Sequence, residues 1–135
     1  MRVLVDTSVW SLALRRNVPP DGAAVAELVE LIREVRVQMI GPVRQELLSG
    51  IRHQAQFEKL RDQLSAFPDL GLSAGDYETA AEFFNLCRAS GVQGSNTDFL
   101  ICAVAARNNL PIFTTDQDFS LFQRHLPITL HIPRI

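Results

Sequence analysis

Short apolar runs alternate with longer amphipathic stretches along the whole chain. The runs at residues 3–5, 37–40 and 111–115 have the length and composition of buried strands. Two further runs, at residues 70–72 and 128–132, predict a weak strand and a last strand. The sequence therefore predicts five short strands separated by longer segments.

The segments between these runs carry apolar residues at helical spacing. In one of them Val25, Leu28, Val29 and Ile32 recur at i, i+3, i+4 and i+7. The predicted helices cover residues 8–15, 23–35, 42–50, 55–67, 74–90, 99–106 and 119–125. Because residues 99–106 are apolar nearly all round, we expect that helix to be central and buried.

Strands and helices interleave throughout the sequence, with no repeat, low-complexity tract or linker between them. The economical arrangement for this order is an α/β fold, a three-layer α/β/α sandwich around a mostly parallel sheet. A length of 135 residues suits a single domain, residues 1–135, and a hydrophobic content of 47% is enough for a substantial core.

Composition excludes several classes of protein. No apolar run approaches the roughly 20 residues that span a membrane, so we expect no membrane partner. The acid at position 6 comes too early for the apolar region of a signal peptide, which predicts a cytoplasmic protein. Cys87 and Cys102 fall in apolar helical patterns and are expected to be buried thiols. The three histidines lack metal-binding spacing and are assigned no role.

Four acidic residues stand where a parallel sheet would expose them. Asp6 follows the first strand, Glu46 lies on the helix after the second, Asp98 opens the apolar helix, and Asp116 follows residues 111–115. Open α/β sheets bind ligands outside the carboxyl ends of their strands. Four carboxylates gathered there repel one another, by about 3 kcal/mol per pair at about 5 Å and an effective dielectric of about 20. A divalent cation removes this repulsion, and hard oxygen ligands suit Mg2+ or Mn2+.

Each acid also has a purely structural interpretation. Asp6 fits the N-cap of a helix, and Asp98 fits a cap or a first-turn acid favoured by the helix dipole. Glu46 fits a solvated helix face. Near residue 116 we expect Asp116 to be the ligand and Asp118 to cap the next helix or support the site. Only the joint placement of the acids at one edge of the sheet favours a metal site over these alternatives.

Two hydroxyl residues lie beside these acids in the sequence. Ser8 is expected either to cap its helix or to hold Asp6 in place with a hydrogen bond. Thr115 is expected to position Asp116 or a substrate phosphate.

The balance of charge says little about nucleic acid. The net charge is −2, and the basic residues are twelve arginines and one lysine. The planar guanidinium of arginine binds two phosphate oxygens at once, which lysine cannot do. Four arginines lie in segments near the predicted site: Arg15, Arg16, Arg44 and Arg52. Composition bias in the source genome explains the arginine excess equally well.

These residues resemble the PIN-domain family, specifically toxins of the VapC type. Residues 6–8, 46–50, 98–103 and 114–119 are similar to the four acidic motifs of that family, in order along the whole chain. The resemblance implies an endoribonuclease that needs Mg2+ or Mn2+, a partner antitoxin that neutralises it, and a homodimer. It also implies that Asp6, Glu46, Asp98 and Asp116 form the acidic quartet, with Ser8 and Thr115 in supporting positions.

The predicted reaction is metal-assisted hydrolysis of an RNA phosphodiester that leaves 3′-hydroxyl and 5′-phosphate ends. Asp6, Asp98 and Asp116 would hold one or two cations, and Glu46 would ligate the second ion or orient the water. The absence of a suitable histidine pair or nucleophile motif in the sequence motivates this hypothesis.

Two other classes of function stay open. A magnesium-binding phospho-acceptor module would need paired acids after the first strand and a lysine near the last strand, and a phosphatase of the haloacid dehalogenase type would need Asp-x-Asp. Here Asp6 stands alone and the lysine is Lys59, in a mid-chain helix. The third possibility is a non-catalytic RNA-binding or partner-binding domain whose acids serve as helix caps.

Overall fold

Three parallel strands form the centre of the molecule. The computed structural model describes residues 1–14 and 22–134. The strands are β1 (Val3–Val5), β2 (Val37–Gln38) and β3 (Ile112–Phe113), in the order β2-β1-β3. The register places Val3 beside Val37, and Val5 beside Phe113. Because β1 is the middle strand, the residue that follows it emerges between the other two strand ends.

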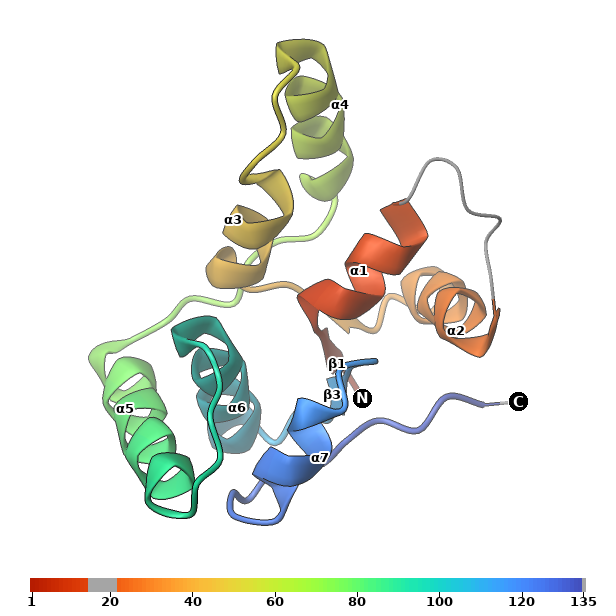
Figure 1. Cartoon of the computed structure of the whole chain (residues 1–135). Helices are drawn as coiled ribbons and strands as arrows, with labels where there is room; N and C mark the ends of the chain where they lie inside the picture. The colour runs from red at the N-terminus through yellow and green to blue at the C-terminus, as the bar shows by residue number, and fades with distance from the viewer. Residues whose placement is uncertain (15–21, 135) are drawn as a thin grey trace.

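Helices cover both sides of this sheet. They are α1 (Thr7–Leu14), α2 (Gly22–Arg33), α3 (Gly41–Leu48), α4 (Gln54–Leu64), α5 (Ala74–Ala89), α6 (Asn96–Asn108) and α7 (Asp118–Gln123). Figure 1 shows α1 and α2 on one side of the strands and α5 and α6 on the other. The predicted α/β sandwich with a parallel sheet is confirmed.

Helix α6 lies in the core, as its sequence predicts. Every residue from Phe99 to Ala105 is buried, and the ring of Phe99 packs against those of Phe84 and Phe122 at centroid distances of 5.5 and 4.9 Å. Truncation of a buried phenylalanine costs about 3–5 kcal/mol. The first turn of α6 is therefore held firmly in place, which matters because Asp98 belongs to that turn.

Two predicted strands are wrong. Neither residues 70–72 nor residues 128–132 form a strand. Isolated parallel bridges join Met39 to Asp69, just before the first run, and Ile112 to Leu130, within the second. The reason is the shortness of their neighbours: β2 is followed almost at once by α3, and β3 ends at Phe113. A segment beside such a short strand finds only one residue with which to pair.

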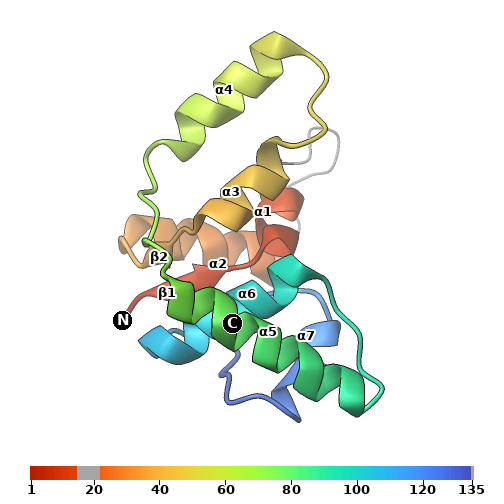
Figure 2. The ribbon, with the colours of Figure 1, turned by 90° about the vertical axis from the view of Figure 1, so that its left-hand side faces the viewer.

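Helices α3 and α4 form a hairpin that projects from the rest of the molecule (Figures 1 and 2). Gly50 allows the turn between them because it adopts a positive φ of 84°. Leu64 is the buried residue of α4, and its other side chains remain at least partly exposed.

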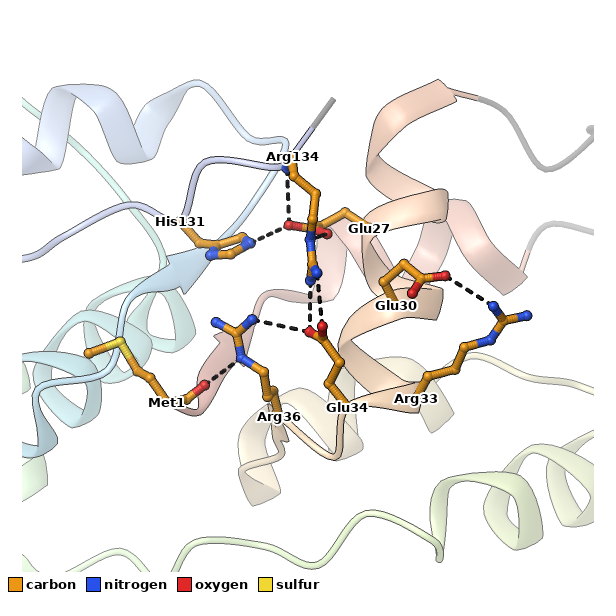
Figure 3. A network of polar contacts seen from close by, with 8 residues as sticks. All are labelled: Met1, Glu27, Glu30, Arg33, Glu34, Arg36, His131 and Arg134. Atoms are coloured by element: carbon orange, nitrogen blue, oxygen red, sulfur yellow. Dashed lines mark hydrogen bonds and ion pairs between the residues drawn. The ribbon is translucent and has the colours of Figure 1, made fainter.

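The C-terminal segment is fastened to α2 by ionic hydrogen bonds (Figure 3). The buried carboxylate of Glu27 contacts His131 Nε2 at 2.7 Å and accepts a hydrogen bond from Arg134 Nε at 2.8 Å. The Arg134 guanidinium also donates twice to Glu34, at 2.8 Å each. Burial raises the pKa of Glu27, but the hydrogen bonds from His131 and Arg134 outweigh it and lower the pKa below its ordinary value. His131, to which the sequence assigned no role, thus has a structural one.

The remaining composition-based predictions concern the thiols and the membrane. Cys87 and Cys102 are free and buried, as predicted, and burial raises the pKa of both thiols. None of the helices in residues 1–14 and 22–134 is long and apolar enough to cross a membrane.

Candidate active site

Two hydroxyl groups hold the buried carboxylate of Asp6. This residue directly follows the middle strand and is only 4% exposed. Its Oδ2 accepts hydrogen bonds from Ser8 Oγ and Thr114 Oγ1, both at 2.8 Å. The hydrogen bond predicted between Ser8 and Asp6 is therefore present.

The same hydroxyls tie the loop after β3 to the end of β1. Ser8 Oγ accepts the backbone N–H of Thr115 at 3.0 Å, and Thr114 Oγ1 accepts the N–H of Asp116 at 2.9 Å. The threonine hydroxyl that serves the site thus belongs to Thr114, whereas Thr115 contributes its backbone. The signal for Thr114 lies in the register, because pairing of Val5 with Phe113 puts Thr114 opposite Asp6.

Asp98 enters the site from the first turn of α6. The helix begins at Asn96, earlier than predicted, and Ser95 is its N-cap. Asp98 Oδ2 accepts the backbone N–H of Ser95 at 3.0 Å, and Ser95 Oγ accepts the N–H of Asp98 at 3.1 Å. This is a reciprocal capping box, so the structural interpretation of Asp98 is realised.

Capping does not account for the raised pKa of Asp98. Burial raises the pKa of this carboxyl, and the negative charges of Asp6 and Asp116 raise it further, against the hydrogen bonds from Ser95. The structure therefore brings three of the four predicted acids close enough for their negative charges to repel one another.

Asp116 contacts the first turn of α7, whose N-cap is Gln117 and whose first residue is Asp118. Asp116 Oδ1 accepts the backbone N–H of Asp118 at 2.9 Å, and the carbonyl of Asp116 accepts the N–H of Phe119 at 3.2 Å. Asp118 is the first residue of the helix, and its carboxylate makes no hydrogen bond with any residue the structure describes. The prediction that Asp118 caps the helix is wrong; that it supports the site stays a prediction.

Glu46 reaches the site from α3 at a more exposed position. Its Oε1 accepts a hydrogen bond from Thr7 Oγ1 at 2.6 Å, and Thr7 directly follows Asp6. Sequence reasoning missed Thr7. A hollow of about 490 Å³ opens beside this pair; its lining residues are Thr7, Pro42, Gln45, Glu46, Ser49 and Thr97. Glu46 therefore stands at the exposed rim of the site, and its hydrogen bond to Thr7 links it to the residue that follows Asp6.

Comparison with known proteins decides the family. The sequence profile of the PIN domain matches residues 3–124. The chain belongs to the PIN-domain family. This confirms the resemblance found in the sequence. A search among curated proteins found no match.

Solved structures support the same fold for this PIN domain. FitAcB from Neisseria gonorrhoeae is 22% identical, with a TM-score of 0.76 over 97% of both chains. VapBC2 from Rickettsia felis, bound to a DNA fragment from its promoter, is 21% identical, with a TM-score of 0.75 over 97% of this chain and 98% of the other. VapBC-5 from Mycobacterium tuberculosis, a member of a family of toxin–antitoxin systems, is 21% identical, with a TM-score of 0.67 over 99% and 98%.

The four carboxylates of this PIN domain share one bonding pattern. Each has one oxygen that accepts hydrogen bonds and a second oxygen that has no hydrogen-bond partner within residues 1–14 and 22–134. None of the four is paired with a described arginine, lysine or histidine.

The buried acids elsewhere in the molecule behave differently. Glu27 and Asp76, which are 3% and 5% exposed, are each paired with an arginine, Arg134 and Arg107. A buried charge in a protein is normally either paired or used to coordinate a metal. Asp6 is equally buried but has hydroxyl partners in place of a cation, which leaves its second oxygen available.

This donor set fits a hydrated magnesium or manganese ion. Among the described residues no three acidic, histidine or cysteine side chains converge closely enough to enclose an ion by themselves. Mg2+ usually keeps several of its waters and takes only one or two protein carboxylates. An open group of hard, anionic oxygens without a counter-cation meets that requirement.

Arg44 does not serve the site. Its guanidinium pairs with Asp69, with Nη2 to Oδ1 at 2.9 Å, and donates to the carbonyl oxygens of Leu64 and Phe67. These bonds tie α3 to the end of α4 and the segment after it, so the guanidinium is already used within the fold. Arg15 and Arg16 lie outside the described residues.

Proposed function

We propose that this PIN domain is a metal-dependent endoribonuclease and the toxin of a type II toxin–antitoxin pair. The observation that carries the proposal is Asp6, a buried carboxylate with hydroxyl partners in place of a cation. Asp98, whose pKa is raised by burial and by Asp6 and Asp116, adds the shared negative field.

The cation would be Mg2+ or Mn2+, held through the available oxygens of Asp6, Asp98, Asp116 and Glu46. When bound, such an ion polarises a phosphoryl oxygen and lowers the pKa of a water molecule. In the proposed reaction, water oxygen bonds to phosphorus while the bond from phosphorus to the 3′-oxygen breaks, which leaves a 3′-hydroxyl and a 5′-phosphate.

The protein groups have distinct tasks in this reaction. Ser8 and Thr114 hold the Asp6 carboxylate in place, because both donate to the same oxygen. Glu46, positioned by Thr7 at the rim, orients the attacking water through its free oxygen. Thr115 holds the loop of Asp116 through its backbone N–H.

The antitoxin partner rests on the structural relatives. The solved VapBC-5 structure belongs to a family of toxin–antitoxin systems, and another relative is a toxin–antitoxin complex from Klebsiella pneumoniae. We extend to this chain a neutralising antitoxin, a homodimer and a cytoplasmic location as parts of the same proposal.

Cleavage of a total-RNA pool tests this function. Wild-type protein should give discrete fragments with Mg2+ or Mn2+ and none with EDTA, and the fragments should end in 3′-hydroxyl groups. Asp6→Asn should abolish the fragments, whereas Glu82→Gln, which removes an exposed charge on α5, should not. Fragments that form in EDTA and carry 2′,3′-cyclic phosphates would contradict the proposal.

The cap at Asp98 and the contact of Asp116 with the first turn of α7 favour one rival, a non-catalytic partner-binding domain. The two functions differ in their response to metal, because a ligand that binds only the folded state raises its melting temperature. A nuclease site should show a rise with Mn2+ that EDTA reverses. A domain whose acids serve only as caps should show none.

A further inference from the structure

A second hollow adjoins the acidic site, between α3, α5 and the first turn of α6. Its volume is about 560 Å³, within the range of small-molecule sites. It shares Pro42, Gln45 and Thr97 with the hollow that contains Glu46, so the two hollows are adjacent. Figures 1 and 2 show the start of α6 beside α5 and close to α3.

Aromatic and amide groups line this second hollow. Tyr77, Ala81, Phe84 and Asn85 come from one face of α5 at helical spacing. Tyr77 is 55% exposed, although it belongs to an apolar stripe of that helix. An exposed aromatic ring beside a half-buried one offers a flat apolar surface at the edge of the site.

Three side-chain amides converge on the same hollow. They belong to Gln45, Asn85 and Asn96, and none of them makes a side-chain hydrogen bond with the part of the chain that the structure describes. All three residues are exposed. Each amide therefore has a donor and an acceptor available for a ligand, and every residue that lines the hollow is uncharged.

We propose that this hollow binds one unstacked nucleobase of the RNA substrate, next to the phosphate that is cleaved. Proteins that read single-stranded RNA stack its bases on aromatic rings and hydrogen bond to their edges. Tyr77 and Phe84 provide the stacking surface, and the amides of Gln45, Asn85 and Asn96 read the base edge. The inference rests on the proposed nuclease function and names the residues that give it base preference.

The position of the amides favours a nucleotide over a protein partner. Gln45 directly precedes Glu46, and Asn96 stands two residues before Asp98, so these two amides share turns of α3 and α6 with the acids. A strand whose phosphate lies at the acids must place a neighbouring base within reach of these turns. The uncharged lining suits a neutral base, while the charged phosphate stays at the acidic site.

Binding in the absence of metal separates the base pocket from catalysis. Fluorescent short homopolymers of adenylate, cytidylate and uridylate are titrated with protein in EDTA. Wild-type protein should prefer one of them, and Tyr77→Ala should weaken that binding about 5- to 100-fold, because a stacking surface is lost. Tyr77→Phe should restore it, and Leu86→Ala, an exposed apolar residue of α5 outside the hollow, should have no effect.

Cleavage of a random-sequence RNA pool gives the second readout. Sequencing of the ends should show a base preference at one position beside the cut, and Asn85→Ala and Asn96→Ala should flatten it while metal dependence is retained. Metal-dependent cleavage with the preference and the RNA affinity intact in all these variants would overturn the base pocket and leave the nuclease standing. Base-selective binding that needs Tyr77, with no cleavage under any condition, would support the pocket and overturn the nuclease.

The remaining alternative is a surface for a second protein. In that case Tyr77→Ala would change the oligomeric state in analytical ultracentrifugation and leave the affinity for all three homopolymers as in wild type. That combination would also overturn the proposal.

Discussion

The charged carboxylate of Asp98 has two opposing effects on the stability of the folded protein. Its carboxylate caps α6 through the N–H of Ser95, yet burial, Asp6 and Asp116 raise its pKa. Because the folded-state pKa lies above the unfolded value of about 4, the protonated form favours folding. This contribution is full below that value and is lost as the pH rises through the raised pKa.

We predict that Asp98→Asn leaves the metal-free protein as stable as wild type at neutral pH, or more stable. The asparagine oxygen can still accept the Ser95 N–H, and the repulsive charge is gone. Asp98→Ala, which loses the cap, should be less stable by about 1 kcal/mol. Thermal unfolding in EDTA from acid to neutral pH measures both. A lower neutral-pH melting temperature for Asp98→Asn would show that capping by the charged group dominates.

At the scale of single residues, the sequence was enough to locate the acids but not all the hydroxyl groups that hydrogen bond to them. Asp6, Asp98 and Asp116 could be placed at one sheet edge because each follows a strand or opens a helix. Thr114 could not be chosen over Thr115, because one residue of strand register decides which side chain faces Asp6. The hydrogen bond from Thr7 to Glu46 depends on how α3 packs against α1, and the sequence carries no signal for that packing.

The element that places Asp98 depends on close packing before its N-cap. A Cβ atom built on Gly94 would lie 2.6 Å from Phe122 Cζ and 3.0 Å from Phe99 Cε2. Both rings are fully buried and cannot move aside. Gly94 thus lets the loop come close enough for Ser95 to cap α6.

We predict that Gly94→Ala destabilises the protein by about 1–3 kcal/mol, the usual cost of overpacking. Gly71→Ala is the matched control, because its Cβ would meet no atom within 4 Å. Urea unfolding compares the two variants. Equal stability of Gly94→Ala and wild type would mean that the Phe99–Phe122 contact is looser than the structure shows.

Elements with strong periodicity were predicted well, and short ones were not. The apolar pattern of α6 identified the central helix because burial on all sides leaves no polar face. The runs at residues 70–72 and 128–132 looked like strands because they are apolar, but pairing depends on the length of the neighbouring strand. That length is set by where Thr114 and Gly41 turn the chain away from the sheet.

At the scale of the whole molecule, ion pairs fasten the C-terminal segment to α2 and to Glu34 just after it. Hydrogen bonds from Arg134 and Arg36 lower the pKa of Glu34 to about 2, and the pKa of Glu27 is also lowered. A carboxyl whose pKa is depressed stabilises the fold above its ordinary value of 4.5, and loses that contribution as the pH falls towards the folded value.

We predict that Arg134→Gln lowers the free energy of unfolding at neutral pH and that this difference shrinks between about pH 4.5 and 2. Arg33→Gln, which removes an exposed pair with Glu30, should change little at any pH. Urea unfolding across this range measures the difference. A wild-type advantage that does not depend on pH would contradict the role given to the C-terminal ion pairs.

The acids form a candidate site only through the tertiary fold, because three elements converge beside the end of β1. The order of strands and helices was enough to predict this convergence, and the four acidic motifs were enough to predict the family. Sequence could not predict that the acids elsewhere in the core, Glu27 and Asp76, would be neutralised by arginines from distant segments while Asp6 was not. That contrast depends on tertiary contacts between residues 31 and 107 positions apart.

The most direct test of the central claim is metal binding, because it needs no knowledge of the RNA substrate. Isothermal titration with Mn2+ should show binding to wild-type protein and to Glu82→Gln. Asp6→Asn should bind about tenfold more weakly or worse. Absence of binding to wild type, or equal binding by Asp6→Asn, would contradict the claim that these carboxylates form a metal site.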